Sequence, residues 1–265
     1  MAKLKQRAKA TSVFAEGLCF EKLFFVFIIG SVFGDYYERI INLVSYSWGG
    51  VTWFWERRSG VIYGPFSVIY GLGAVIMILT FIWLPNKIIL RKKLASDSMK
   101  SAKSSAAKDS QPAVAIKTSE TPLKWWQILI MGGLLGGMLE YFLGVLQEIF
   151  TGTSSWNYSD HWMNIGAKTS PFVMLIWGVI CVLLVKFAYP FLSKCIEKIP
   201  RRIGEVLFWI LLIFICLDIL ISFSAVLKMN LRHHNVPSFT PYGQFLDSTY
   251  PDEKIHKAYP NMVNV

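Results

Sequence analysis

The sequence is poor in charged side chains. Only 17% of its 265 residues are charged, whereas a soluble domain carries roughly a quarter. Apolar residues make up 54%, the mean hydropathy is +0.43, and the apolar residues gather into runs. Val61–Leu84 contains no charge, and Phe208–Leu227 contains only Asp218. Runs of about 20 apolar residues match a hydrocarbon core of about 30 Å. Composition therefore excludes an ordinary soluble domain and predicts an integral membrane protein.

Cysteine is scarce, and the common catalytic signatures are absent. The four cysteines lie in or beside apolar runs and form no C-x-x-C pair, so neither a disulfide framework nor a zinc site is predicted. Without G-x-x-x-x-G-K-[ST] the chain cannot itself be the ATPase of a pump. It also has no G-x-S-x-G elbow and no H-E-x-x-H helix. We expect no enzyme activity, no metal and no cofactor.

The positive charges lie at the ends of the apolar runs. A net charge of +10 could favour nucleic acid, but this location is typical of membrane proteins, whose Lys and Arg gather on the cytoplasmic side. Alternate flanks of the runs carry 18 Lys and Arg on one side against 7 on the other. We therefore expect a multi-pass protein of the cell membrane with a cytoplasmic N-terminus, an external C-terminus and no nucleic-acid partner.

The apolar runs predict an all-α, polytopic fold with about five spans. These are expected at residues 20–45, 61–84, 125–149, 170–192 and 205–228. A segment rich in Ala, Ser and Lys without aromatics separates two similar halves and cannot bury enough apolar surface to fold. The predicted division is a first membrane repeat (1–93), a flexible cytoplasmic linker (94–121), a second membrane repeat (122–200), an additional C-terminal transmembrane helix (201–228) and an irregular tail (229–265).

A repeated motif supports this duplication. Gly30-x-x-x-Gly34-x-x-x-Glu38 recurs as Gly132-x-x-x-Gly136-x-x-x-Glu140, offset by 102 residues. Both halves enter the membrane from the same side, so we expect two parallel-repeat hairpins related by an axis along the membrane normal. Residues four apart share one helix face. Glycines there let another helix approach closely, so these four are predicted packing positions.

Glu38 and Glu140 are the main candidate functional residues. Each stands one helical turn beyond its second glycine and should point into the bundle. A carboxylate at that depth is costly unless it is paired, hydrated or protonated. One interpretation is a structural ion pair with Arg39, Arg57 or Arg58, and another is an interfacial position. The remaining one is a site for a proton, a cation or a polar substrate.

The other candidates for substrate binding are mostly aromatic. Tyr63 and Tyr70 follow the first span, and Trp156 and Tyr158 follow the third. They fit an aromatic interface belt with a proline in the first helical turn. They also fit a broken or re-entrant start to the span, with backbone groups lining a polar cavity. Asp218, within the last apolar run, must face protein or water, either as a site residue or as a hydrogen-bond partner of a neighbouring helix.

Several of these residues resemble a bacterial membrane family known as putative ABC-transporter type IV proteins, also called permease-like. The resemblance covers roughly residues 20–225 without the linker. It lies in Gly34-x-x-x-Glu38, Arg58-Ser-Gly60-Val-Ile-Tyr63-Gly64-Pro65-Phe66-Ser-Val-Ile-Tyr70-Gly71-Leu-Gly73, Glu140-Tyr141, Glu148, Trp156-Asn157-Tyr158-Ser159 and Trp177-Gly178.

The resemblance implies a transporter-like membrane subunit, here with paired glutamates at the repeat interface. If ATP powers it, a separate ATPase must dock on the cytoplasmic connections at 86–124 and 193–204. The alternative is a non-transporting scaffold or regulator that binds a partner or lipid through its glycine faces. The sequence leaves the oligomeric state open.

Overall fold

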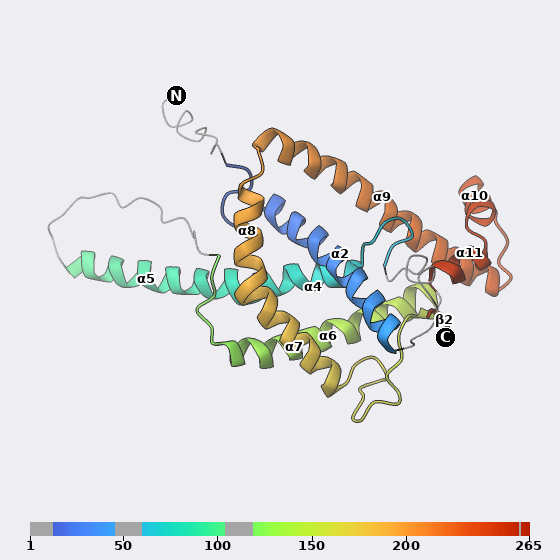
Figure 1. Ribbon diagram of the computed structural model, residues 1–265, viewed down its shortest axis with the longest axis horizontal. Coiled ribbons are helices and arrows are strands. Elements are labelled where there is room, and N and C mark those ends of the chain that lie inside the picture. Colours follow the sequence, from blue (N-terminus) through green and yellow to red (C-terminus); the bar gives the residue numbers. More distant parts are fainter. Residues whose placement is uncertain (1–12, 46–59, 104–118, 260) are drawn as a thin grey trace.

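The computed structural model describes residues 13–45, 60–103, 119–259 and 261–265. Among these residues it is mostly helical (Figure 1). The elements are α2 (Phe20–Ser45), α4 (Val68–Ile78), η1 (Leu79–Trp83), α5 (Leu84–Lys103), α6 (Trp125–Thr151), β1 (Thr153–Ser154), α7 (Pro171–Leu183), η2 (Leu184–Ala188), α8 (Tyr189–Glu197), α9 (Arg201–His233), α10 (Pro241–Thr249), α11 (Asp252–Ala258) and β2 (Val263–Asn264).

Four helical stretches in the described chain are long and apolar enough to cross a membrane. They are Val68–Ser96, Trp125–Thr151, Pro171–Glu197 and Arg201–His233. Each overlaps a predicted span. α2 coincides with the first predicted span, at 26 residues, but it is not among the four. Asp35, Glu38 and Arg39 lower its hydropathy, and Arg39 Nε donates to Asp35 Oδ2 over 2.6 Å. This ion pair is almost completely buried, so α2 carries its charges inside the protein.

The glycine motifs lie where helices cross. α2 packs chiefly against α4, and α6 against α7. A Cβ placed on Gly34 would stand 2.2 Å from Tyr70 Cγ, and one on Gly136 would stand 2.4 Å from Trp177 Cβ. Similarly, Gly30 faces Ala74, and Gly132 faces Cys181. All four predicted packing glycines therefore lie against the second helix of their own hairpin. A Cβ at Gly34, Gly132 or Gly136 would require its neighbour to shift, and one at Gly30 would make a tight contact.

These contacts correspond pairwise between the two hairpins. Equivalent residues of α2 and α6 are 102 positions apart in the sequence, and equivalent residues of α4 and α7 are 107 positions apart. The correspondence extends to the opposite side of the crossing. Gly71 approaches the backbone oxygen of Phe27, and Gly178 approaches that of Leu129.

Each hairpin also has a π-helical segment before a proline. η1 precedes Leu84-Pro85, and η2 precedes Tyr189-Pro190. A proline inside a helix has no N–H to donate, and its ring clashes with the carbonyl four residues earlier. One widened turn relieves this clash and lets the helix continue as α5 or α8.

The described connections gather at two opposite ends of the bundle (Figure 1). At one end lie the beginning of α2, α5, the α8–α9 junction and residues 119–124. There buried Lys22 donates to Ser193 Oγ over 2.9 Å and pairs with Glu197, joining α2 to α8. At the other end lie residues 60–67, the α6–α7 connection and the C-terminal segment. The predicted topology assigns the same two groups of connections to opposite sides of the membrane.

The C-terminal segment differs from the irregular tail that we expected. α9 continues to His233, α10 and α11 follow, and β2 pairs antiparallel with β1. The prolines that suggested irregularity begin the helices: Pro241 is the first residue of α10, and Pro251 caps α11. α5 likewise continues to Lys103, ten residues into the expected linker, because Lys, Leu, Ala and Met favour helix.

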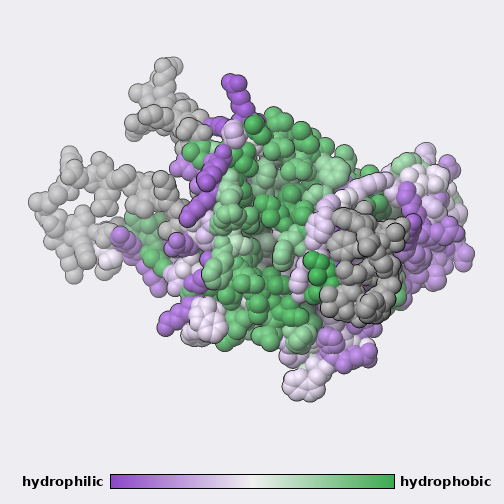
Figure 2. Space-filling model, viewed as in Figure 1, coloured by the Kyte–Doolittle hydropathy of each residue, from purple (hydrophilic) through white to green (hydrophobic). Residues whose placement is uncertain are grey.

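Hydrophobic side chains cover the middle of the molecule between two hydrophilic ends on the face shown in Figure 2. Many are strongly exposed, such as Trp209, Ile213 and Leu220 on α9 and Leu134 and Phe142 on α6. An apolar surface this extensive is expected to face hydrocarbon. The fold is thus that of an all-α membrane protein.

Candidate transport site

Glu140 lies on the glycine-lined face of α6, inside a candidate membrane span. Its side chain is 8% exposed. Tyr158 Oη, from the α6–α7 connection, donates to Glu140 Oε1 over 2.9 Å. Trp177 Nε1, from α7, donates to Oε2 over 3.3 Å. In the part of the chain that the structure describes, no Lys, Arg or His forms an ion pair with Glu140. Neutral donors hold this buried carboxylate.

An aromatic stack joins this carboxylate to the first hairpin. The rings of Trp177 and Tyr70 are stacked, with centroids 5.2 Å apart and an interplanar angle of 29°. The ring of Tyr70 in turn lies beside that of Tyr37 of α2, with ring centroids 5.8 Å apart. Tyr70 fills the space at Gly34, and Trp177 fills the equivalent space at Gly136. The glycines therefore let two aromatic rings meet at the boundary between the hairpins, beside Glu140.

Glu38 lies on the same side of the structure as Glu140. Burial, together with the negative charges of Glu140 and then Glu38, raises the pKa of Tyr158 above its ordinary value. A single phenol thus lies within electrostatic reach of both carboxylates. Glu38 is half-buried on α2. We name Tyr37, Glu38, Tyr70, Glu140, Tyr158 and Trp177 the central cluster.

Tyr63 and Asp218 belong to a different group of contacts. Residues 60–67 are not helical and lie against α9. Asp218 Oδ1 accepts from the backbone N–H of Tyr63 over 3.1 Å, and Ser222 Oγ accepts from that of Ile62 over 2.8 Å. On the α2 side, the N–H of Ser67 donates to Ser31 O over 3.0 Å. The span therefore has a non-helical entry whose backbone groups are bonded to neighbouring helices.

Trp156 is in a third place, in the connection between α6 and α7. Its Nε1 donates to Lys168 O over 3.1 Å, and its ring lies against Gly144. Lys168 pairs with Glu148 of α6 and is mostly buried. In the structure Trp156 stabilises the connection between α6 and α7, which also carries Tyr158. Of the seven predicted binding residues, the structure thus gathers four: Glu38, Tyr70, Glu140 and Tyr158.

Two members of the central cluster were not predicted as site residues. Tyr37 precedes Glu38 and is one of several aromatic residues in an apolar run. Trp177-Gly178 had a stronger signal, because it is the counterpart of Tyr70-Gly71 at the 107-residue offset. The alternative ion-pair partners Arg57 and Arg58 lie outside the described residues, whereas Arg39 pairs with Asp35.

Among the described residues, no group of three or more His, Cys, Asp or Glu is arranged to hold a metal ion. His233 and His234 have ring centroids 5.6 Å apart near the end of α9, and Arg232 beside them serves an ion-pair network.

Comparison with known proteins gives one match. The model of a family described as "Putative ABC-transporter type IV" matches residues 25–223. No curated protein and no solved structure matches the chain.

Proposed function

The chain belongs to the putative ABC-transporter type IV family, and we propose that it is a membrane-embedded, permease-like component that handles a proton or small cation at the central cluster. Family membership and the apolar helices make it a membrane protein related to transport. The choice of ligand rests on Glu140. A buried carboxylate held by neutral donors is costly when ionised, and it is stabilised by taking up a proton or a cation.

The paired hairpins support a shared site. Equivalent glycines meet equivalent partners in α2–α4 and α6–α7, which is expected if one hairpin was duplicated. With α2 as a fifth span, both hairpins would cross the membrane in the same direction. Glu38 and Glu140 would then lie at related positions around a common axis. The negative charges of both act on the phenol of Tyr158. Two carboxylates that share one site in a low dielectric should not both be ionised, which suits a transport step.

The alternative function, a scaffold that binds a partner through its glycine faces, is less well supported. Those faces are already occupied within the chain: Tyr70 covers Gly34, and Trp177 covers Gly136. An external helix would have to displace α4 or α7. An ATPase, if one powers the process, would dock at the end of the bundle that carries α5 and the α8–α9 junction.

Ion flux through reconstituted protein tests the proposal. Proteoliposomes loaded with a pH-sensitive dye are given a K⁺ diffusion potential with valinomycin, and proton entry is followed. The same vesicles are tested with Na⁺ and K⁺ tracers. We expect Glu140→Gln and Glu38→Gln each to lower the flux at least tenfold while inserting normally, and the double variant to be little worse. Glu205→Gln is the matched control, because Glu205 is an exposed carboxylate of α9.

Two results would contradict the proposal. One is wild-type protein that carries none of the tested ions faster than empty vesicles. The other is full activity of the Glu140→Gln variant, which would make the buried carboxylate purely structural.

A further inference from the structure

A cavity lies between α11 and the non-helical entry to α4, away from Glu140. It has a volume of about 320 Å³ and is partly open. This volume is at the lower end of the range found for small-molecule sites. Ile62 and Tyr63 line one side, and Tyr250, Lys254, Ile255 and Lys257 line the other.

The polar groups of this cavity are cationic or neutral. Lys254 Nζ donates to the backbone oxygen of Thr249 over 2.9 Å and stands 4.7 Å from the ring centroid of Tyr250. In the described part of the chain, no carboxylate forms an ion pair with this ammonium group. The hydroxyls of Tyr63 and Tyr250 lie 2.7 Å apart and supply a second polar point. The remaining lining is apolar and consists of Ile62, Ile255 and Ala258, of which Ile255 is almost fully buried and packs in one cluster with Ile62.

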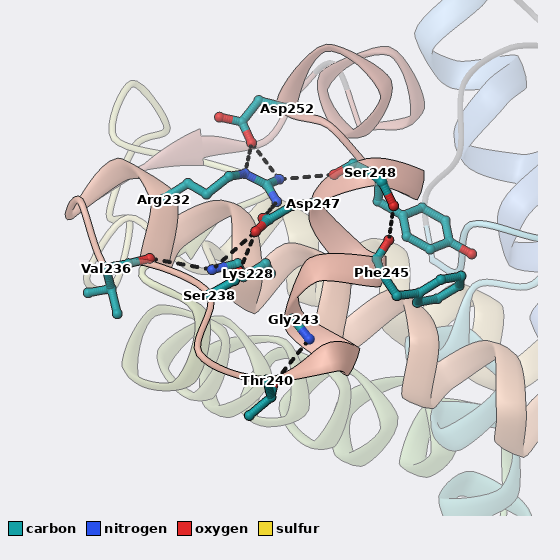
Figure 3. A network of polar contacts seen from close by, with 11 residues as sticks. Lys228, Arg232, Val236, Ser238, Thr240, Gly243, Phe245, Asp247, Ser248 and Asp252 are labelled. Atoms are coloured by element: carbon teal, nitrogen blue, oxygen red, sulfur yellow. Dashed lines mark hydrogen bonds and ion pairs between the residues drawn. The ribbon is translucent and has the colours of Figure 1, made fainter.

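An ion-pair network joins α9 to α10 and to α11, the helix that lines one side of the cavity (Figure 3). Arg232 of α9 donates from Nε to Asp252 at the start of α11 and from Nη1 to Asp247 of α10, each over 2.7 Å. Its Nη2 donates to the backbone oxygen of Tyr250 over 2.9 Å. On the other wall, Tyr259 Oη donates to Gly60 O over 3.0 Å. Both sides are thus held before any ligand arrives, which lowers the entropic cost of binding.

We propose that this cavity binds a small organic anion, with its carboxylate or phosphate at Lys254 and Lys257 and its apolar body against the half-buried side chains of Ile62 and Ala258. A charge-assisted hydrogen bond to an ammonium group favours an acidic head. The partly open apolar space favours a compact apolar body rather than a bare inorganic ion. Such an anion could be a soluble organic acid or the acidic headgroup region of a membrane lipid, because both present the same chemistry.

Calorimetric titration of the full chain in phosphatidylcholine nanodiscs tests this site. The probes are phenyl phosphate and benzoate, with benzylamine as a cationic analogue of the same ring. We expect saturable binding of the anions and at least tenfold weaker binding of benzylamine. Lys254→Gln combined with Lys257→Gln should weaken anion binding about ten- to hundredfold. Lys194→Gln, an exposed lysine of α8 at the opposite end, is the control.

Two further variants separate the site from general loss of structure. Ala258→Phe, from the half-buried end of α11, should fill the cavity and abolish binding without changing charge. Lys254→Arg keeps the charge and should retain binding within a few-fold.

The source of the anion is distinguished by the lipid. Loss of phenyl phosphate binding when phosphatidylglycerol is added to the nanodiscs would support the site and identify a lipid headgroup as its occupant. Unchanged binding would support it with a soluble acid as occupant. Absence of saturable anion binding in phosphatidylcholine, or equally tight binding of benzylamine, would overturn the proposal.

Discussion

At the scale of single residues, spacing in the sequence predicted the helix face on which a residue lies better than it predicted the residue's hydrogen-bond partners. The interval of four placed Gly34, Gly136 and Glu140 on packed helix faces, because helix geometry fixes which residues share a face. It could not indicate that Trp177 donates to Glu140, since an aromatic residue in an apolar run usually only packs. Asp218 accepts from Ser222 Oγ one turn away and also from the backbone N–H of Tyr63, 155 residues away, and no local pattern encodes the second bond.

Gly136→Ala is predicted to destabilise the second hairpin. A Cβ at this position would lie 2.4 Å from Trp177 Cβ, so α7 must shift, at a cost of roughly 1–3 kcal/mol for an overpacked core. This exceeds the gain of about 1 kcal/mol from replacing glycine in a helix. Thermal unfolding of the detergent-solubilised protein should show a lower Tm.

Gly73→Ala is the control for that substitution. Its Cβ would lie 3.4 Å from Trp177, an ordinary contact distance, so its Tm should stay the same or rise. Equal Tm losses for the two variants would show that the close crossing at Gly136 is not what limits packing.

Asp247 is predicted to make docking of α10 sensitive to acid. Burial opposes its ionisation, but hydrogen bonds from Ser238 and Arg232 and the charges of Lys228 and Arg232 outweigh burial and lower its pKa. A carboxyl whose folded-state pKa is depressed contributes stability above its unfolded pKa, about 4 for Asp. That contribution is lost as the pH falls through the folded-state pKa.

Hydrogen–deuterium exchange of α10, corrected for the intrinsic effect of pH, measures this loss. Protection should be constant from pH 7 to 5 and should fall below about pH 4. The Asp247→Asn variant should be less protected at pH 7 and change less on acidification. An identical pH profile in the two proteins would exclude Asp247 as the titrating group.

At the scale of elements, long apolar runs predicted four of the five expected spans as membrane-length apolar helices, whereas the C-terminal helices were missed. α6 and α9 stand out because hydrocarbon demands about 20 apolar residues. α10 and α11 are short and begin at prolines, and they depend on tertiary contacts. Leu246, Tyr250 and Ile255 pack on α9, and Arg232 clamps both helices. The π segments were also missed, although Pro85 and Pro190 are visible signals of a widened turn.

Arg232→Gln is predicted to release the C-terminal segment from α9. The substitution removes ion pairs to Asp247 and Asp252 and a hydrogen bond to Tyr250 O. Loss of one charge-assisted contact at a partly buried site costs roughly 1.5–3 kcal/mol, so the open population should rise at least tenfold. Trypsin cleavage after exposed Lys254 and Lys257 should accelerate correspondingly.

The control is Arg201→Gln, which removes only an exposed pair with Glu205 one turn away in the same helix. Such pairs contribute about 0.3–0.5 kcal/mol. Cleavage should therefore stay at the wild-type rate. Equal cleavage of the Arg232→Gln and wild-type proteins would mean that the apolar contacts of α10 and α11 alone hold the segment.

At the scale of the whole molecule, charge asymmetry and duplication predicted the arrangement of the connections. The sequence separates lysine-rich connections from lysine-poor ones, and the structure puts α5 and the α8–α9 junction at one end and α10–α11 at the other (Figure 1). Hydropathy does not place α2 among the spans, because five charged residues lie within it. The packing of α2 against α4, through Gly30 and Gly34, is what puts it within the bundle.

The topology predicts that the two ends face opposite sides of the cell membrane, with the lysine-rich end inside. Single cysteines at Ser96 and Gln244, both exposed, report on them in a background whose four native cysteines are replaced by serine or alanine. In intact cells a membrane-impermeant maleimide should label the residue-244 cysteine and leave that at 96 unlabelled until the membrane is opened. Labelling of both from outside would place α5 and α10 on one side, and an even number of crossings would then lie between them. The three crossings expected from α6, from α7 with α8, and from α9 would then be wrong, and with them the topology on which the parallel hairpins are based.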